Sequence, residues 1–211
     1  MPNNYKKIEL QTWFRKDAFH FYRSYQDPFF NLTADVEVGA LYRDAKKKGQ
    51  SFFIRCLHLS LQIANEQEAF SRRILKDELV AYDQINGGSA ILNDDRSMSF
   101  CFFDYDQNVD QFLKLTEKEI VDQQERKGIV ERENEINRIH FSVIPWVSFT
   151  SFKHAHSGKK DDCIPKIVFG KIRKGENGSV VMPLSIEAHH SMMDGYEMGL
   201  FFERFEELAS R

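Results

Sequence analysis

The chain has 211 residues, a length that fits one domain with one core. Its composition, 42% hydrophobic with 19 phenylalanines, can fill a packed interior and excludes wholesale disorder. The formal charge is -3, with acids and bases mixed along the chain, which gives no electrostatic footprint for nucleic acid or for an anionic membrane.

The first third of the chain carries helical patterns. Apolar residues recur at helical spacing over residues 16–25, 41–48 and 52–65. Trp13 stands where it could anchor the start of the first helix. The third pattern predicts a deeply buried helix.

The middle of the chain changes character twice. Short β-favouring runs at 74–83, 88–93 and 97–106 predict consecutive strands, and Gly87-Gly88 predicts a turn between the first two. Residues 106–137 are strongly charged and carry apolar residues on one side, which predicts solvated helices.

Strands dominate the second half. The runs at 139–152, 165–172 and 179–188 predict three more strands, with a tight hairpin at 174–178 between the last two. A final helix is predicted over 196–209. Strands interleaved with uneven helices predict an α/β two-layer sandwich, in which helices cover a mixed β-sheet.

The cysteines and the start of the chain bear on the compartment. Cys56, Cys101 and Cys163 are odd in number and far apart, which matches neither a disulfide framework nor a zinc site. We interpret them as reduced, mostly buried thiols. The first 14 residues lack the apolar stretch of a secretory signal, so we expect a cytoplasmic protein.

One segment, residues 185–195, concentrates polar chemistry where a buried strand ends and a helix begins. It contains His189, His190, Asp194 and Gly195. A histidine has an unperturbed pKa of about 6.5, so it can accept and return a proton at neutral pH, for example from a hydroxyl. Adjacent strand residues point to opposite faces and no third ligand is evident, which disfavours a metal. Spacing alone leaves a structural core histidine equally open.

The segment resembles the His-His-x-x-x-Asp-Gly signature of the chloramphenicol acetyltransferases, within the CoA-dependent acyltransferase superfamily. Further landmarks of that family follow in order along the chain: Trp13-Phe14-Arg15-Lys16, Phe21-Tyr22-Arg23, Lys76-Asp77-Glu78-Leu79, Asp110-Gln111-Phe112, Pro145-Trp146-Val147 and Met182-Pro183-Leu184-Ser185. The resemblance implies a chloramphenicol acetyltransferase-like fold, with residues 1–211 forming a single CoA-dependent acyltransferase domain.

The resemblance also implies a set of roles. His190 would be the general base that deprotonates the acceptor hydroxyl as it attacks acetyl-CoA, without an acyl-enzyme. Ser142 would donate a hydrogen bond to the oxyanion, and Arg15 would form an ion pair with Asp194 that orders the site. The family works as a homotrimer with active sites at subunit interfaces, uses no metal, and confers antibiotic resistance.

The expected binding residues depart from the family in places. Tyr22 and Met98 fall at acceptor-pocket positions, with Met98 in place of a phenylalanine. His154 and His156 stand where chloramphenicol-binding members have apolar walls. Lys171 falls on the strand that lines the coenzyme channel. The acceptor could therefore be chloramphenicol or another small alcohol.

A second departure concerns the oxyanion. Val168 replaces a threonine that assists oxyanion stabilisation in the family, and residues 128–134 lack an aromatic segment often found there. Three alternatives stay open at this point. They are an acyltransferase of the same fold acting on a different acceptor, including the dihydrolipoamide type of the 2-oxoacid dehydrogenase complexes; a non-catalytic trimeric assembly protein; and a metal-binding module. No lipoyl domain or long linker of the dihydrolipoamide type is recognisable in residues 1–211.

Overall fold

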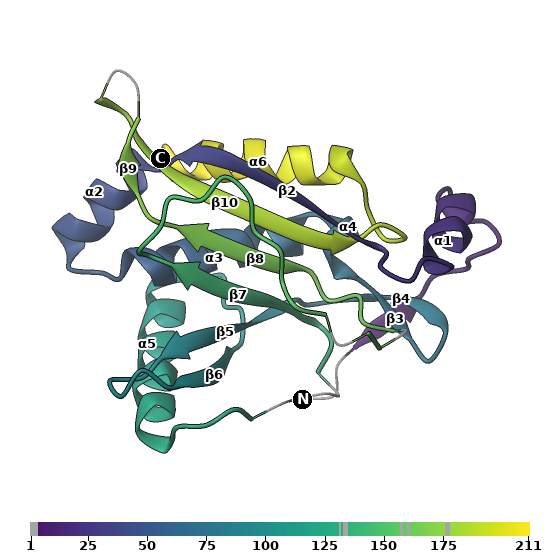
Figure 1. The fold of residues 1–211 in the computed structure, drawn as a ribbon, viewed down its shortest axis with the longest axis horizontal. Helices are drawn as coiled ribbons and strands as arrows, with labels where there is room; N and C mark the ends of the chain where they lie inside the picture. The colour runs from purple at the N-terminus through teal and green to yellow at the C-terminus, as the bar shows by residue number, and fades with distance from the viewer. Residues whose placement is uncertain (1–3, 131, 133–134, 157, 160, 176–177) are drawn as a thin grey trace.

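The computed structural model describes residues 4–130, 132, 135–156, 158–159, 161–175 and 178–211 (Figure 1). Within these residues a seven-stranded mixed sheet has the order β2-β10-β8-β7-β5-β6, with β9 paired to β10. Its strands are β2 Phe29–Glu37, β5 Asn86–Leu92, β6 Met98–Phe103, β7 Arg138–Ile144, β8 Lys166–Gly170, β9 Arg173–Lys174 and β10 Val180–His189. A smaller sheet has the order β1-β4-β3, with strands Tyr5–Lys7, Glu78–Tyr82 and Arg72–Leu75.

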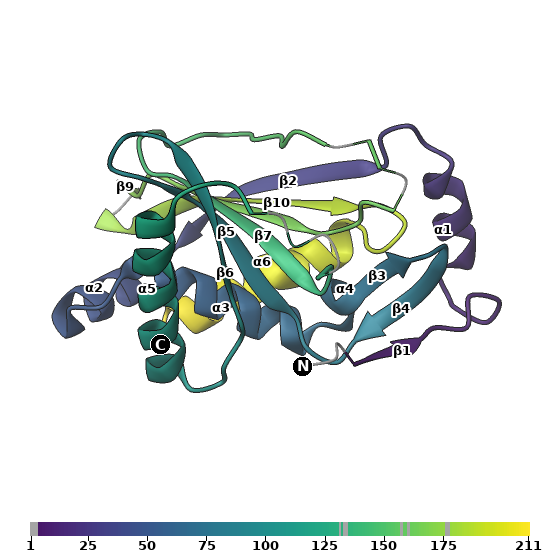
Figure 2. The same cartoon turned by 90° about the horizontal axis from the view of Figure 1, so that it is seen from below.

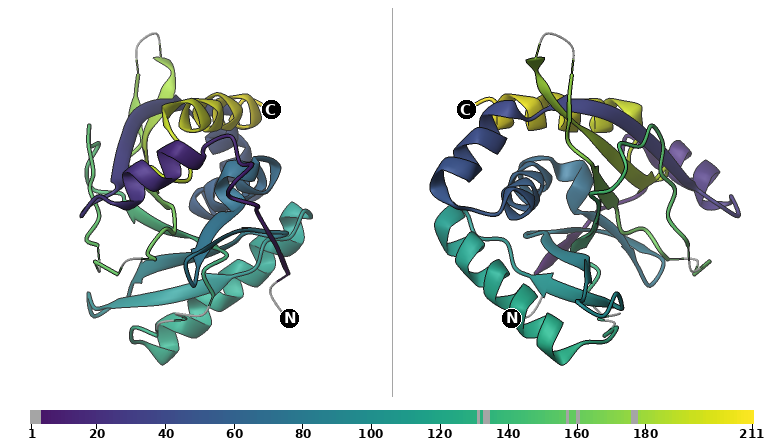
Figure 3. Two further views of the ribbon diagram at one scale, coloured as in Figure 1. Left: turned by 90° about the vertical axis from the view of Figure 1, so that its right-hand side faces the viewer. Right: turned by 60° about the vertical axis from the view of Figure 1, so that its left-hand side comes forward.

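The described helices are α1 Lys16–Arg23, α2 Gly39–Lys48, α3 Phe52–Glu66, α4 Glu68–Ser71, α5 Val109–Arg126 and α6 Gly195–Ala209. Helices α3, α5 and α6 pack against the large sheet, whereas α1 lies beyond its edge (Figure 1). Figure 2 shows α3 and α6 beneath the sheet, while the chain that follows β7 runs along the opposite face. The two views of Figure 3 show the same layers from the sides. The predicted two-layer α/β sandwich is therefore confirmed.

The core lies between the sheet and α3 with α6. Ser51 begins α3 because its side chain accepts a hydrogen bond from the backbone N–H of Ile54. Leu57, Leu61 and Ile63 of this helix are fully buried, as the sequence predicts. These residues belong to a hydrophobic core cluster that also contains apolar side chains of β10 and α6. The strand that leads to the histidine pair is therefore anchored in the interior.

The predicted turn at Gly87-Gly88 is wrong, because both residues lie inside β5. A Cβ built on Gly87 would lie 2.1 Å from the ring of Phe103, and one on Gly88 would lie 2.9 Å from the ring of Phe102. The glycines therefore make room for the aromatic rings of the paired strand β6. The predicted run 74–83 instead splits at Lys76 and Asp77, which both have positive φ and form a two-residue hairpin turn.

Other helices and strands also begin or end at residues different from those predicted. Among the described residues of the charged region there is one helix, α5, that ends at Arg126, and the strand predicted over 139–152 ends at Ile144. The sequence reading missed β2 altogether, although it is nine residues long and pairs with β10 over its whole length. The three cysteines are free and buried, as predicted. Among the described residues, no helix combines the length and apolarity needed to cross a membrane.

Candidate active site

The end of β10 delivers the histidine pair to one edge of the large sheet, next to α1. In Figure 1 β10 runs toward α1, whereas β7 and β8 run the opposite way. His190 follows the last strand residue, and its backbone N–H donates to the carbonyl of Pro28 at 2.8 Å. Asp194 then begins α6 with a capping box, in which Glu197 accepts from the backbone N–H of Asp194 at 2.9 Å. A short, fixed loop thus carries His190.

The imidazole of His190 lies between two aromatic rings. Tyr22 of α1 stacks on it with centroids 3.8 Å apart and planes at 3°. Phe30 of β2 covers it at 4.2 Å and 26°. The Nδ1 atom of the ring is buried, so Nε2 is the nitrogen left to meet a substrate. The ring is half-buried as a whole.

Arg15 ties this loop together. Its Nη1 donates to Asp194 Oδ2 at 2.6 Å, and its Nη2 donates to the carbonyl of His190 at 3.2 Å. The guanidinium is 9% exposed. Partial burial opposes ionisation of Asp194, but the hydrogen bonds from Arg15 and from the Tyr196 N–H outweigh it and lower the pKa of Asp194 to about 2. The ion pair expected from the family resemblance is present.

The ion pair gives a pH-dependent stability. Because the folded-state pKa of Asp194 is depressed, its contribution is present above the ordinary value of 3.8 and is lost as pH falls towards about 2. Asp194→Asn keeps one side-chain oxygen for the helix cap, but it removes the charge and the second oxygen, which accepts from Arg15. We expect a loss of about 1 kcal/mol in the free energy of unfolding at pH 7, since the carboxylate is 40% exposed and screened by solvent.

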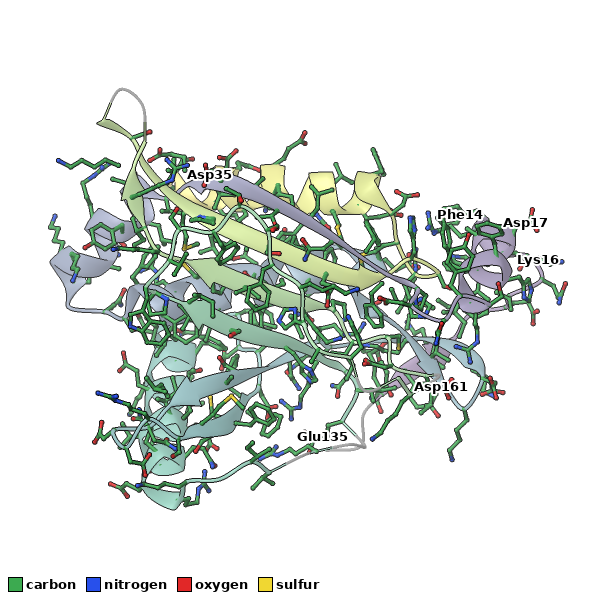
Figure 4. The ribbon with its side chains drawn as sticks, viewed as in Figure 1. Phe14, Lys16, Asp17, Asp35, Glu135 and Asp161 are labelled. Atoms are coloured by element: carbon green, nitrogen blue, oxygen red, sulfur yellow. The ribbon has the colours of Figure 1, made fainter. Side chains whose placement is uncertain are left out.

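Urea unfolding of the two proteins from pH 7 to pH 2 measures this difference. It should stay constant down to about pH 5 and shrink below pH 4. Asp35→Asn is the matched control, because Asp35 pairs with Arg173 on the surface at the far end of the sheet from α1 (Figure 4). An equal loss in both variants at pH 7 would contradict a special role for the Arg15–Asp194 pair.

His189, the first histidine of the pair, has a structural environment. It is 2% exposed, and burial, followed by the nearby Arg23, lowers its pKa to about 4. The backbone N–H of Ser191 donates to its Nδ1 at 3.2 Å. A neutral ring that accepts on Nδ1 fixes the turn after β10. His190, and not His189, is therefore the histidine that could exchange a proton with a substrate.

Ser142 and Met98 line a different part of the molecule. They share a largely apolar groove of about 800 Å³ with Phe53, Ile91 and Trp146. Val168 lies directly opposite Ser142 in the parallel β7–β8 pair. A valine at this position offers no hydrogen-bond donor beside the Ser142 hydroxyl. The groove therefore presents Ser142 as a polar atom among apolar walls.

A second cavity, of about 320 Å³, adjoins this groove and is lined by Lys171. Phe53, Val143 and Pro145 border both spaces. The predicted coenzyme-channel residue and the predicted oxyanion donor thus lie at one end of the sheet. The two cavities are therefore neighbours that share part of their lining.

His154 and His156 contact a buried carboxylate instead. His154 Nδ1 lies 3.4 Å from Glu187 Oε1, and His156 Nε2 lies 3.0 Å from the same atom. Glu187 is 1% exposed. Burial, followed by the charge of Lys166, lowers the pKa of His156. Both imidazoles therefore fasten the segment after β7 to the face of the sheet. In the part of the chain that the structure describes, no group of three metal-ligating side chains could hold an ion.

Within one chain the structure does not bring His190 and Ser142 together. Ser142 of β7 pairs with Val168 of β8, and Val168 pairs in turn with Ser185 of β10. His190, just beyond the end of β10, lies five residues after Ser185, which corresponds to roughly 16 Å at about 3.3 Å per residue. Strand β8 also separates them. Tyr22 lies with the base, whereas Met98 and Lys171 lie with Ser142. The predicted site residues thus form two separate groups, with His154 and His156 apart from both, beside Glu187.

Sequence reasoning missed two residues of the site. Phe30 lies in the overlooked strand β2, whose even positions 30–36 are apolar and whose odd positions 31–37 are polar. That strict alternation was a usable strand signal. Glu187 gave no signal of its own, because its two histidine partners come from a distant, irregular segment.

A comparison with known proteins places the chain. A sequence model of the chloramphenicol acetyltransferase family matches residues 3–206. The chain belongs to the chloramphenicol acetyltransferase family. A relative from Staphylococcus aureus, a chloramphenicol acetyltransferase, is 32% identical over 99% of this chain and 97% of its own length. Chloramphenicol acetyltransferase 3 of Escherichia coli is 27% identical, with 98% of each protein covered.

Solved structures agree with this family assignment. A chloramphenicol acetyltransferase superposes with a TM-score of 0.85 and 29% identity, covering 99% of this chain and 100% of that one. A probable dihydrolipoamide acetyltransferase from Listeria monocytogenes has a TM-score of 0.65 at 14% identity, covering 97% and 94%, and shares the fold alone. The family makes this chain an O-acetyltransferase with acetyl-CoA as its co-substrate.

Proposed function

We propose that the protein acetylates a hydroxyl of chloramphenicol or of a related small alcohol, with His190 as general base. The observation that carries the proposal is the fixed orientation of the His190 imidazole. His190 is stacked between Tyr22 and Phe30, its Nδ1 is buried, and its loop is fixed by Arg15. A ring held in this way can accept a proton repeatedly at Nε2 without losing its orientation.

The same atom, Nε2 of His190, takes up the proton and later gives it back. Nε2 of His190 takes the proton of the acceptor hydroxyl while the oxygen attacks the thioester carbonyl of acetyl-CoA. Collapse of the tetrahedral intermediate breaks the carbon–sulfur bond, and the departing thiolate recovers the proton from Nε2. The products are the acetyl ester and CoA with a free thiol. Ser142 stabilises the oxyanion by donating one hydrogen bond.

We infer that Ser142 comes from a second copy of the chain. One chain separates the two groups by roughly 16 Å along the sheet, which is beyond the reach of a single attacking oxygen. A ring of copies would place the His190 group of one subunit against the groove of the next, since a head-to-tail contact repeats around a closed ring. We propose a homotrimer of cytoplasmic enzyme, in keeping with the family.

Acceptor choice would then depend on both groups. Tyr22 contributes from the side of the base, and Met98 contributes from the groove. His154 and His156, together with Glu187, bring polarity to a segment that the family resemblance leads us to expect to be apolar. This polar cluster favours, as a second candidate, an alcohol more polar than chloramphenicol.

An acceptor screen tests the proposal. Release of free thiol from acetyl-CoA is followed with purified protein, chloramphenicol and a panel of small alcohols and amines. We expect thiol release with chloramphenicol or with at least one other alcohol, together with the corresponding acetyl ester. Release with amines alone would overturn the reaction class, and no release with any acceptor would favour a non-catalytic assembly protein.

A further inference from the structure

A second arginine, Arg72, contacts the loop that carries His190. Arg72 is 5% exposed, and its Nη1 donates to the carbonyl of Met192 at 3.2 Å. A buried carbonyl that lacks a donor is costly, so this hydrogen bond stabilises the loop. Arg15 binds the same loop at its two ends, at the carbonyl of His190 and the carboxylate of Asp194. Arg72 therefore binds the middle of the loop.

Arg72 reaches the loop from the small sheet. It is the first residue of β3 and follows α4 directly. Its guanidinium lies over the ring of Trp13, 5.2 Å from the centroid, and 5.7 Å from that of Phe14. A guanidinium is attracted to the face of an aromatic ring, most strongly to tryptophan. Because Trp13 precedes Arg15 by two residues, Arg72 supports the segment that presents Arg15 as well as the loop that Arg15 binds.

Met192 depends on this contact for its carbonyl. Its side chain is 1% exposed and packs in a small apolar cluster that contains Phe19 and Ile74. Its backbone N–H donates to the carbonyl of His189 at 2.9 Å. Among the described residues, no second donor reaches the Met192 carbonyl. Removal of the Arg72 guanidinium would therefore leave a buried acceptor unpaired two residues after His190.

We propose that Arg72 is a positioning residue for the acetyl transfer: it fixes the middle of the 190–194 loop, so that Arg15 binds both ends and His190 keeps its place. This inference rests on the proposed role of His190 as base. Arg72 acts through the loop backbone and needs no contact with substrate. A displacement of a catalytic group by about 1 Å can cost about 100-fold in rate. Loss of the guanidinium should therefore appear in kcat.

Kinetics of two Arg72 variants test the proposal. Arg72→Met keeps the stem of the side chain but removes every donor, so kcat should fall about 10- to 100-fold while both KM values stay within about threefold. Arg72→Lys keeps the charge and one donor group and should lose less, about 3- to 10-fold. If Arg72→Met does not fold, Arg72→Lys carries the test. A kcat within about twofold of the wild-type value in the folded variants would overturn the proposal.

Two control variants separate this role from the general loss of an ion pair. Glu68→Gln removes the charge that faces Arg72 Nη2 at 3.2 Å but keeps an accepting oxygen, so kcat should stay unchanged. Arg204→Met removes a different arginine, which binds Glu66 and Glu207, and should also leave kcat unchanged. A loss of kcat in Arg204→Met as large as that in Arg72→Met would contradict a specific role for Arg72.

A second readout is independent of activity. The backbone N–H groups of His190 and Met192 donate to the carbonyls of Pro28 and His189, at 2.8 and 2.9 Å, so their hydrogen exchange reports how firmly the loop is held. In Arg72→Met these amides should exchange at least about 10-fold faster, while the amides of helix α3 keep their rates. Unchanged exchange in the loop would overturn the proposal. If the loop loosens but the wild-type protein acetylates no hydroxyl, the proposed function fails while the role of Arg72 in holding the loop stands.

Discussion

Replacing His190 by alanine is expected to lower kcat for thiol release by roughly 10,000-fold. The reason is chemical: no other group at the end of β10 can take the hydroxyl proton, because His189 is buried and accepts the Ser191 N–H through Nδ1. General-base assistance contributes up to about this factor. KM for acetyl-CoA should change little, since Lys171, the residue proposed to line the coenzyme channel, lies at the other end of the sheet.

Two controls separate chemistry from folding in this experiment. His190 is half-buried at the edge of the sheet, so the alanine variant should unfold within a few degrees of the wild-type Tm. His20→Ala changes an exposed histidine of the neighbouring helix α1 and should leave kcat unchanged. Turnover by His190→Ala at the wild-type rate would remove His190 from the mechanism.

Ser142→Ala should cost about 100- to 1,000-fold in kcat, the second largest effect. The loss of one oxyanion donor has this magnitude in other acyl-transfer enzymes. Here the neighbouring strand offers no substitute, because Val168 is the residue level with Ser142. The remaining lining of the groove is largely apolar, so a water molecule would find few partners with which to replace the hydroxyl.

The kinetic signature of Ser142→Ala is specific. An interaction made only in the transition state lowers kcat and kcat/KM by the same factor. Ser210→Ala, at the end of α6 on the protein surface, serves as the control with unchanged kinetics. A rise in KM with kcat unchanged would show that Ser142 binds substrate in the ground state and does not stabilise the oxyanion.

Much of the architecture could be predicted from local patterns. The buried face of α3 and the apolar run of β10 are explicit in the sequence, and each forms the predicted element. Strand β2 shows the same kind of alternation and was overlooked. Gly87 and Gly88 misled the prediction for a physical reason: glycine marks a turn or a close approach of two chains, and only the paired strand β6 decides between them.

The sequence predicted which residues belong to the candidate site better than it predicted where they lie relative to one another. The family resemblance supplied His190, Arg15 and Asp194, which the structure brings together. It also supplied Ser142, which lies in a separate groove. Sequence gives no distance between strand positions until the register of β10, β8 and β7 is known. That register separates His190 from Ser142 and makes the interface between copies the expected place of reaction.

Subunit mixing tests this central claim most directly. His190→Ala and Ser142→Ala chains are each nearly inactive, and their co-expression yields oligomers that contain both. If each site takes its base from one copy and its oxyanion donor from the next, random mixing should restore about one quarter of the wild-type thiol-release rate. Activity of the co-expressed protein no higher than that of either variant alone would contradict a site shared between copies.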